Sequence, residues 1–309
     1  MMKVIEGLGQ FEQPDFSVVT IGTFDGVHIG HQTILDQLTH VAEENNGKSI
    51  LITFWPHPRF VLSGDSGALK LLSTFDEKTE LLAALGLDYI IKIPFTPEFS
   101  NLSAADFIKR ILVNFIKTKH LFIGYDHHFG NNREGDIHFL KKLATIYDYQ
   151  VEEIPRQDID DIGVSSTKIR DYLLNGEVQL ANVLLGRSYS IEGKVVHGDK
   201  LGRVIGYPTA NIEIEEGYKL LPADGVYAVH VIVRDERLRG MCNIGFKPTF
   251  EGEKRTIEVH LFQFDEDIYD LPLKIEFVQL LRKEMKFHSV DELKSQLNMD
   301  KQNAINILS

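Results

Sequence analysis

The chain has 309 residues, which is long enough for two domains of ordinary size. Hydrophobic residues make up 43% of the chain and charged residues 25%, proportions that exclude a collagen-like or an intrinsically disordered protein. The 45 acidic and 33 basic side chains give a net charge of -12, which disfavours nonspecific binding to nucleic acid or to an anionic membrane, so any phosphate site is expected to be local.

The first half of the sequence alternates β-rich runs with amphipathic helical patterns. The runs expected to form strands are 17–22, 49–54, 89–93, 120–124 and 150–154. Apolar residues at helical spacing predict helices over 75–85, 104–116, 136–147, 166–174 and 178–184. This order predicts a Rossmann-like, doubly wound α/β domain over residues 1–183.

The texture of the sequence changes after Gly186. β-rich runs separated by Gly and Pro turns, with no helix between them, predict strands over 189–196, 226–233, 238–244, 256–264 and 273–280. Closely spaced strands of this kind favour a small antiparallel β-barrel over residues 184–309. Residues 290–308 return to helical spacing, and Ser289 is the expected N-cap of a terminal helix.

The cysteine content and the hydropathy of the sequence indicate where in the cell the protein is expected. Cys242, the one cysteine, excludes an intramolecular disulfide, and its apolar neighbours predict a small buried residue. No apolar run reaches the roughly 18 residues that span a bilayer, and the first ten residues lack the apolar stretch of a signal peptide. We therefore expect a cytoplasmic protein.

The first predicted strand runs into the segment IGTFDGVHIGH, residues 21–31. Gly22 and Gly30 lack a Cβ at the entry to a helix, where N–H groups and the helix dipole favour an anion. His28 and His31 are three residues apart, so they point the same way and can donate to a triphosphate. Donors aimed at charge that develops on an α-phosphate are what nucleotidyl transfer needs.

Other interpretations of this segment stay open at this point. The two histidines could form a surface pair in a tight turn, or bind zinc, although a zinc helix wants HExxH and Ile29 stands at the glutamate position. The letters HIGH also occur in class I aminoacyl-tRNA synthetases, whose partner motif KMSKS is absent from this sequence.

The segment GTFDGVHIGH is similar to the signature of bacterial FAD synthetases, which join an FMN adenylyltransferase to a riboflavin kinase. PHP at 56–58 and GYDHHFG at 124–130 match further segments of that family, with His127 and His128 where an aromatic and a variable residue are usual. The resemblance implies that the first domain transfers AMP from ATP to FMN. It also implies an FMN site made by Pro56, His57, Pro58, Gly124, Asp126 and Phe129.

The segment SSTKIR, residues 165–170, has phosphate-binding chemistry of its own. Hydroxyls at a helix start, followed by cations one turn on, can hold the β- and γ-phosphates of ATP, although such a run alone is usually a capped helix. The segment resembles the second nucleotide motif of these adenylyltransferases. The resemblance implies an ATP site, with His28 and His31 as catalytic residues, made by Gly22, Thr23, Phe24, His28, Gly30, His31, Ser165, Ser166, Thr167 and Arg170.

The second half contains the segment GKVVHGDKLGRVIGYPTANI, residues 193–212. Its glycines alone would be read as turns, but Thr209 and Asn211 place two oxygen ligands on one side of an extended chain, and Mg²⁺ prefers oxygen ligands. The segment resembles the riboflavin kinase signature GxxxGRxxGxPTAN, which implies that Thr209 and Asn211 serve magnesium and ATP. The implied ATP site is Gly193, Gly198, Lys200, Gly202, Arg203, Gly206, Pro208, Thr209 and Asn211.

Glu258 lies in the alternating run TIEVHLF, whose plain interpretation is a strand that turns Glu258 and His260 toward solvent. Phosphorylation of an alcohol needs a carboxylate that accepts the hydroxyl proton. The resemblance to riboflavin kinases implies that Glu258 is this general base, and that Arg282 in the segment LRKEMKF contacts riboflavin.

The resemblance therefore implies two reactions with ATP as co-substrate and Mg²⁺ as cofactor: riboflavin is phosphorylated to FMN, and FMN is then adenylylated to FAD with release of pyrophosphate. The oligomeric state stays open. One alternative is a nucleotidyltransferase for another phosphorylated small molecule, with the barrel as a specificity domain. A non-catalytic flavin sensor is the other, but pure binding needs neither Glu258 nor the pair of His28 and His31.

Overall fold

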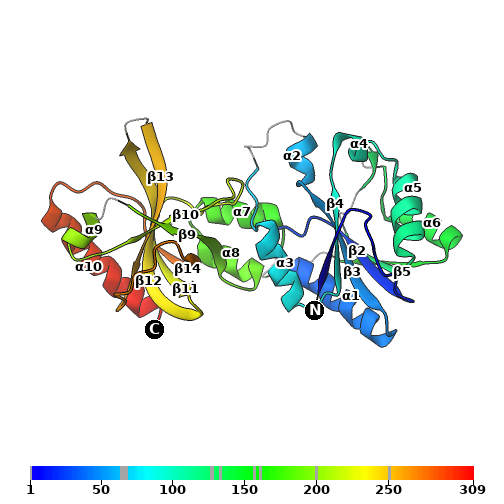
Figure 1. The fold of residues 1–309 in the computed structure, drawn as a ribbon, viewed down its shortest axis with the longest axis horizontal. Coiled ribbons are helices and arrows are strands. Elements are labelled where there is room, and N and C mark those ends of the chain that lie inside the picture. The colour runs from blue at the N-terminus through cyan, green and yellow to red at the C-terminus, as the bar shows by residue number, and fades with distance from the viewer. Residues whose placement is uncertain are drawn as a thin grey trace. The chain divides into compact units, whose positions relative to one another are not determined.

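The computed structural model describes residues 2–62, 69–125, 129–131, 134–155, 158–159, 162–198, 201–249 and 252–309. Contacts within the chain divide it into two units, Met1–Ser165 and Ser166–Ser309 (Figure 1). A domain boundary at residue 183 stays a prediction, because contact density does not define where two functional domains divide.

A parallel sheet with the strand order β1-β4-β3-β2-β5-β6 forms the centre of the first unit. Its strands are β1 (Lys3–Glu6), β2 (Ser17–Ile21), β3 (Lys48–Trp55), β4 (Tyr89–Pro94), β5 (Thr118–Gly124) and β6 (Gln150–Ile154). The five expected strands are present, and the structure adds β1 at one edge. Four mostly exposed residues, KVIE, offer too short a pattern to predict a strand.

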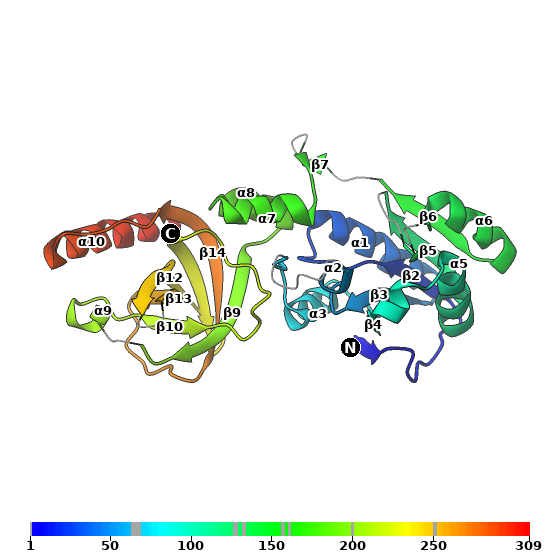
Figure 2. The same ribbon diagram turned by 90° about the horizontal axis from the view of Figure 1, so that it is seen from above.

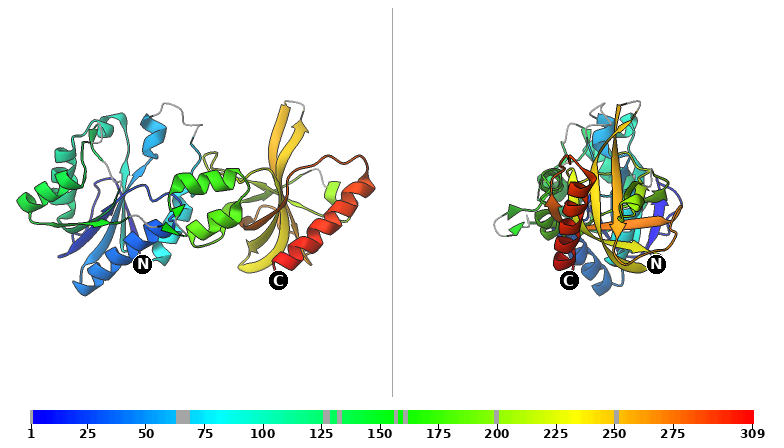
Figure 3. Two further views of the ribbon diagram at one scale, coloured as in Figure 1. Left: turned by 180° about the vertical axis from the view of Figure 1, so that it is seen from behind. Right: turned by 90° about the vertical axis from the view of Figure 1, so that its left-hand side faces the viewer.

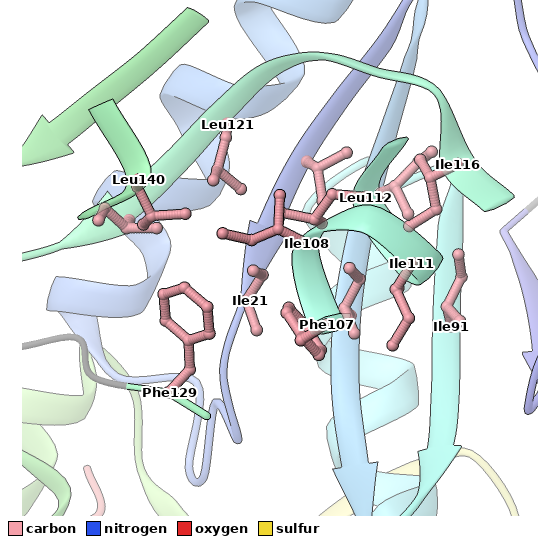
Figure 4. Close-up of a cluster of buried hydrophobic side chains, with 14 of the residues drawn as sticks. Ile21, Ile91, Phe107, Ile108, Ile111, Leu112, Ile116, Leu121, Phe129 and Leu140 are labelled. Carbon is pink, nitrogen blue, oxygen red and sulfur yellow. The ribbon is translucent and has the colours of Figure 1, made fainter. Parts of the chain in front are cut away.

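Helices cover both faces of this sheet (Figure 1). One core contains residues of α1 and α3, and the other, shown in Figure 4, contains residues of α5, η1 and α6. The helices of the first unit are α1 (Ile29–Glu44), α2 (Pro58–Leu62), α3 (Phe75–Ala84), α4 (Pro97–Ser100), α5 (Ala104–Phe107), the π-helical η1 (Ile108–Ile116) and α6 (Ile137–Tyr147). A short antiparallel pair, β7 (Asp158–Ile159) and β8 (Ile162–Gly163), follows β6.

The second unit begins with α7 (Ser166–Leu174) and α8 (Val178–Leu185), which pack on the strands that follow. Asn182 Nδ2 donates to the Phe277 carbonyl at 2.8 Å, and the Ala223 N–H donates to the Leu173 carbonyl at 2.9 Å. By contact these helices therefore group with the second unit.

Six antiparallel strands close into a barrel with the order β10-β13-β12-β11-β14-β9, and α10 packs against it (Figures 2 and 3). The elements are β9 (Tyr189–Val196), α9 (Leu201–Val204), β10 (Ala210–Glu213), β11 (Gly225–Val233), β12 (Glu236–Thr249), β13 (Gly252–Leu261), β14 (Pro272–Arg282) and α10 (Val290–Ile307). The expected combination of a Rossmann-like domain, a barrel and a terminal helix is confirmed. The expectation of no helix between the strands is wrong, because the four-residue α9 is too short to show helical periodicity.

Cys242 is a buried residue of the barrel. The residue is 0% exposed and lies opposite Tyr227 where β11 pairs with β12, and burial raises the pKa of its thiol. The expectation of a small buried residue is confirmed, and a thiol held in its neutral form is not a nucleophile. At the start of α10, the Ser289 hydroxyl accepts a hydrogen bond from the Glu292 N–H, as expected for an N-cap.

Candidate active sites

The turn between β2 and α1 carries the two histidines. His28 is the N-cap of α1, and its Nδ1 accepts a hydrogen bond from the His31 N–H at 3.3 Å. The two imidazoles stack with 3.6 Å between ring centroids, and the Phe24 ring stacks on His31 at 4.5 Å. Because Nδ1 of His28 is an acceptor, the neutral ring carries its proton on Nε2. His28 is only 6% exposed, so the interpretation as a surface pair is wrong for this residue.

The sequence pattern gave no role to Asp25, which anchors this turn. Its carboxylate is 4% exposed and accepts hydrogen bonds from the N–H groups of Leu72 at 3.0 Å and Ser73 at 3.2 Å. The Ser73 hydroxyl in turn accepts from the Gly26 N–H at 3.2 Å. Such ties are needed because Phe24, at φ 48°, has a backbone conformation that non-glycine residues rarely adopt.

Other predicted residues follow neighbouring strands of the first unit. Gly22 follows β2, Pro56 follows β3, and Gly124 ends β5, so all three lie at the carboxyl edge of the parallel sheet, where ligands of such folds bind. The Phe129 ring lies instead in the hydrophobic core, 5.5 Å from the ring of Phe107. The predicted residue Asp126, and the neighbouring His127 and His128, lie outside the described residues.

The SSTKIR segment spans the division between the two units. Ser165 is the last residue of the first unit, and α7 begins the second at Ser166. Thr167 is exposed and Arg170 is partly buried on this helix, while Ile169 packs inward with 0% exposure. The expected helix start with hydroxyl side chains is therefore present.

In the second unit, the strand register brings the predicted kinase residues together. Asn211 of β10 lies opposite Glu258 of β13, and the Thr209 hydroxyl donates to Glu258 Oε2 at 3.1 Å. On the neighbouring strand β12, Lys247 Nζ lies 2.5 Å from Glu258 Oε1. Both oxygens of the carboxylate are thus held, one by a hydroxyl and one by a cation. Lys247 lies in the segment NIGFKPTF, residues 243–250, which resembles the riboflavin kinases, but it had no predicted role, because only the pairing of β12 with β13 brings it to Glu258.

The outer face of β13 is not a solvent face. The side chain of Glu258 is 17% exposed, and His260 is 7% exposed beside α10. His260 Nδ1 lies 2.7 Å from the Pro208 carbonyl, which only accepts hydrogen bonds, so Nδ1 carries a proton. Burial lowers the pKa of His260. The plain interpretation of the TIEVHLF run is therefore wrong, because the segment before β10 covers its polar side: Thr209 bonds Glu258, and the Pro208 carbonyl bonds His260.

The helix α10 is tied to two segments that the sequence analysis singled out. The Tyr207 hydroxyl, just before the PTAN segment, donates to Asn298 Oδ1 at 2.5 Å. Arg282 Nε bonds both oxygens of Asp300, a residue 2% exposed, at 3.1 and 2.9 Å. Arg282, predicted to contact riboflavin, is therefore held by a buried carboxylate, and Asp300 is a contributor that only the docking of α10 reveals.

The glycines of the kinase motif allow close approaches of the chain. A Cβ at Gly198 would overlap the amide of Asn211, and a Cβ at Gly202 would overlap the Tyr207 carbonyl oxygen. Gly206 has φ 86°, which favours glycine. The predicted residue Lys200 lies outside the described residues. Beside this motif, a pocket of about 450 Å³ is lined by Asn211, Lys247, Thr256 and Ile257, among others.

The close approach at Gly202 yields a prediction. The Cβ of Gly202→Ala would meet the Tyr207 carbonyl oxygen and should push the Tyr207–Thr209 segment away from Glu258. We expect the rate of alcohol phosphorylation to fall roughly tenfold, which corresponds to about 1.4 kcal/mol of transition-state stabilisation. Val204→Ala in the same short helix is the control, because Val204 is 84% exposed and should leave the rate unchanged. Steady-state phosphorylation assays test this, and a Gly202→Ala rate equal to that of the control would contradict it.

Comparisons with known proteins address both units. A family model described as FAD synthetase matches residues 10–168, and one described as riboflavin kinase matches residues 185–308. The bifunctional riboflavin kinase/FMN adenylyltransferase of Bacillus subtilis is 38% identical over 306 residues, covering 96% of this chain and 94% of that protein. The chain belongs to this family. The enzyme of the same name from Escherichia coli strain K12 is 36% identical, covering 97% of the chain and 96% of its own length.

The fold of the whole chain is similar to that of a solved structure. A protein from Streptococcus pneumoniae, described as a macrolide-efflux protein, superposes with a TM-score of 0.90 at 31% identity and covers 99% of both chains. Within the described part of this bifunctional family member, none of the helices combines the length and the hydropathy that a membrane span requires.

Proposed function

We propose that the two reactions of this enzyme occur in two separate sites, a kinase site at Glu258 in the barrel and an adenylyltransferase site at the histidine turn of the first unit. As a member of the bifunctional family, the chain phosphorylates riboflavin to FMN with ATP, and then transfers AMP from ATP to FMN, giving FAD and pyrophosphate. The observation that carries the proposal is the cluster of Thr209, Lys247 and Glu258 in the barrel, since the histidine turn lies in the other unit.

In the kinase site, Glu258 acts as the general base. Its carboxylate accepts the proton of the ribityl primary hydroxyl while that oxygen bonds to the γ-phosphorus of ATP and the bond to ADP breaks. Thr209 and Lys247 hold the carboxylate in one orientation. Arg282, fixed by Asp300, contacts the flavin, and the glycine segment before Tyr207 lies along the phosphates of ATP.

The residues beside Glu258 fit Mg²⁺. Because the proton of the Thr209 hydroxyl points to Glu258, the lone pairs of its oxygen remain for a cation, and the Asn211 amide supplies a second hard oxygen. Mg²⁺ is typically held by few protein oxygens together with substrate phosphates. Thr209 and Asn211 would hold the ion, which when bound neutralises charge on the phosphates of ATP.

In the adenylyltransferase site, no covalent enzyme intermediate is needed. A phosphate oxygen of FMN bonds to the α-phosphorus of ATP as the bond to pyrophosphate breaks. His28, through Nε2, and His31 donate to the charge that develops on the α-phosphate. Ser165, the first residue of the SSTKIR segment and the last of this unit, binds the β- and γ-phosphates, and residues of the PHP and GYDHHFG segments bind FMN. We also propose a cytoplasmic location, because both reactions consume ATP and the cytoplasm supplies it.

Chromatography of the flavins that the purified chain forms tests the proposal. Riboflavin with ATP and Mg²⁺ should give FMN followed by FAD, and FMN with ATP and Mg²⁺ should give FAD. Chelation of the metal should stop both conversions. No conversion of either flavin would return the assignment to another nucleotidyltransferase, and conversion at full rate after chelation would remove Mg²⁺ from the mechanism.

A further inference from the structure

Beneath the histidine turn lies a buried cation. Lys78 of α3 is 5% exposed, and its Nζ donates to the Thr23 carbonyl at 3.1 Å and to the Thr53 hydroxyl at 3.2 Å. Nζ also lies 5.0 Å from the centre of the Phe75 ring. Burying an ammonium group is costly, and burial lowers the pKa of Lys78 to about 8. Packing alone does not explain why an ammonium group is buried at this cost in desolvation free energy.

The charge that opposes Lys78 comes from the same turn. Asp25 lowers the cost of the charged ammonium group, while Lys92 of β4 raises it. Asp25 itself is held by the N–H groups of Leu72 and Ser73, in the segment that leads into α3. The turn is therefore fastened at two points, by the Asp25 carboxylate to the segment before α3 and by the Thr23 carbonyl to α3 itself.

The hydrogen bond from Lys78 to the Thr23 carbonyl controls the orientation of the Thr23–Phe24 peptide group. A peptide is planar and trans, so its carbonyl and the N–H of the next residue point in opposite directions. With the Thr23 carbonyl turned toward Lys78 Nζ, the Phe24 N–H of the same trans peptide points the opposite way, away from the ammonium group. The Gly26 N–H, in contrast, is turned inward to the Ser73 hydroxyl. The orientation of the Thr23–Phe24 peptide thus decides whether the turn presents an N–H or a carbonyl to an anion.

We propose that Lys78 is a positioning residue for adenylyl transfer: it holds the Thr23 carbonyl inward, so that the Phe24 N–H and the stacked His28 and His31 face the α-phosphate. This inference rests on the proposed role of the histidine turn. Without the ammonium group, the carbonyl is free to turn outward, where its oxygen would repel the charge that grows on the phosphate in the transition state. The loss should therefore affect turnover more than ground-state binding of ATP.

Three variants test the proposal in the full chain, with FMN and ATP as substrates for FAD formation. Lys78→Met should lower kcat for FAD formation roughly 30-fold, while KM for ATP changes less than about threefold. Lys78→Arg restores a cation with several donors and should be at least about tenfold faster than Lys78→Met. Lys92→Met is the matched control: among the described residues Lys92 contacts the Phe75 ring, at 4.3 Å, and pairs with Glu6, and removal of its like charge leaves the bond from Lys78 to Thr23 in place, so FAD formation should not fall.

The same chain supplies an internal check on folding. Riboflavin phosphorylation occurs in the other unit, so it should stay unchanged in all three variants. The proposal is overturned if Lys78→Met forms FAD within threefold of the unmodified chain, if KM for ATP takes the whole effect, if Lys78→Arg is no faster than Lys78→Met, or if both reactions fall together. Failure of the histidine assignment is distinguished by His31→Ala: full FAD formation in that variant removes the turn from the mechanism, whatever Lys78 does.

Discussion

Glu258→Gln is expected to abolish FMN formation from riboflavin while FMN is still converted to FAD. Glutamine keeps the size of the side chain and an oxygen for the Thr209 hydroxyl, but it cannot accept the substrate proton. General bases contribute about 10²- to 10⁴-fold to rates, so the loss should exceed roughly 100-fold in kcat. Product chromatography with riboflavin in one sample and FMN in the other measures both reactions on one preparation.

A matched control for this variant lies on β14. Glu276 is also a strand carboxylate, 21% exposed and paired with a cation, Arg237, at 2.9 Å. Glu276→Gln removes a similar ion pair away from Thr209 and should leave FMN formation unchanged. A folded Glu258→Gln variant that loses both reactions would contradict separate sites, and one that keeps FMN formation would show that another group accepts the proton.

His31→Ala is expected to stop FAD formation and spare the kinase. The substitution removes a donor to the α-phosphate and the ring that stacks between Phe24 and His28. Losing one donor of this kind costs about 10²- to 10³-fold in turnover, and we expect a loss in that range. Rates of FAD formation from FMN and of FMN formation from riboflavin, measured side by side, check it.

His40 provides the control on the same helix. It is an exposed residue that pairs with Glu44 on the outer side of α1, so His40→Ala should affect neither reaction. If His31→Ala matched His40→Ala in FAD formation, His31 would have no part in the transfer. A parallel loss of kinase activity in His31→Ala would mean that the effect spreads beyond the first unit.

Local pattern was sufficient for most elements of the fold. The run at residues 150–154 and the helix at 166–174 have the predicted bounds, because a strand or a helix of that length shows its own periodicity. Three isolated elements of four residues, β1, α9 and β10, were not predicted, because four residues are too few for a periodic pattern to be recognised. The helix expected over 104–116 is present, but its division into α5 and the π-helical η1 depends on packing in the core shown in Figure 4.

The sequence by itself indicated the chemistry that each unit can offer: glycines with His28 and His31 at a helix start in one, and Thr209, Asn211 and Glu258 as oxygen groups in the other. Those choices are local, since each motif needs only its own residue types at their own spacing. The supporting groups were decided by the tertiary structure alone. Strand pairing brings Lys247 to Glu258, the docking of α10 brings Asp300 to Arg282, and the packing of α3 places Lys78 beneath the turn. Each of these contacts joins residues on different elements, so no pattern along one element could reveal it.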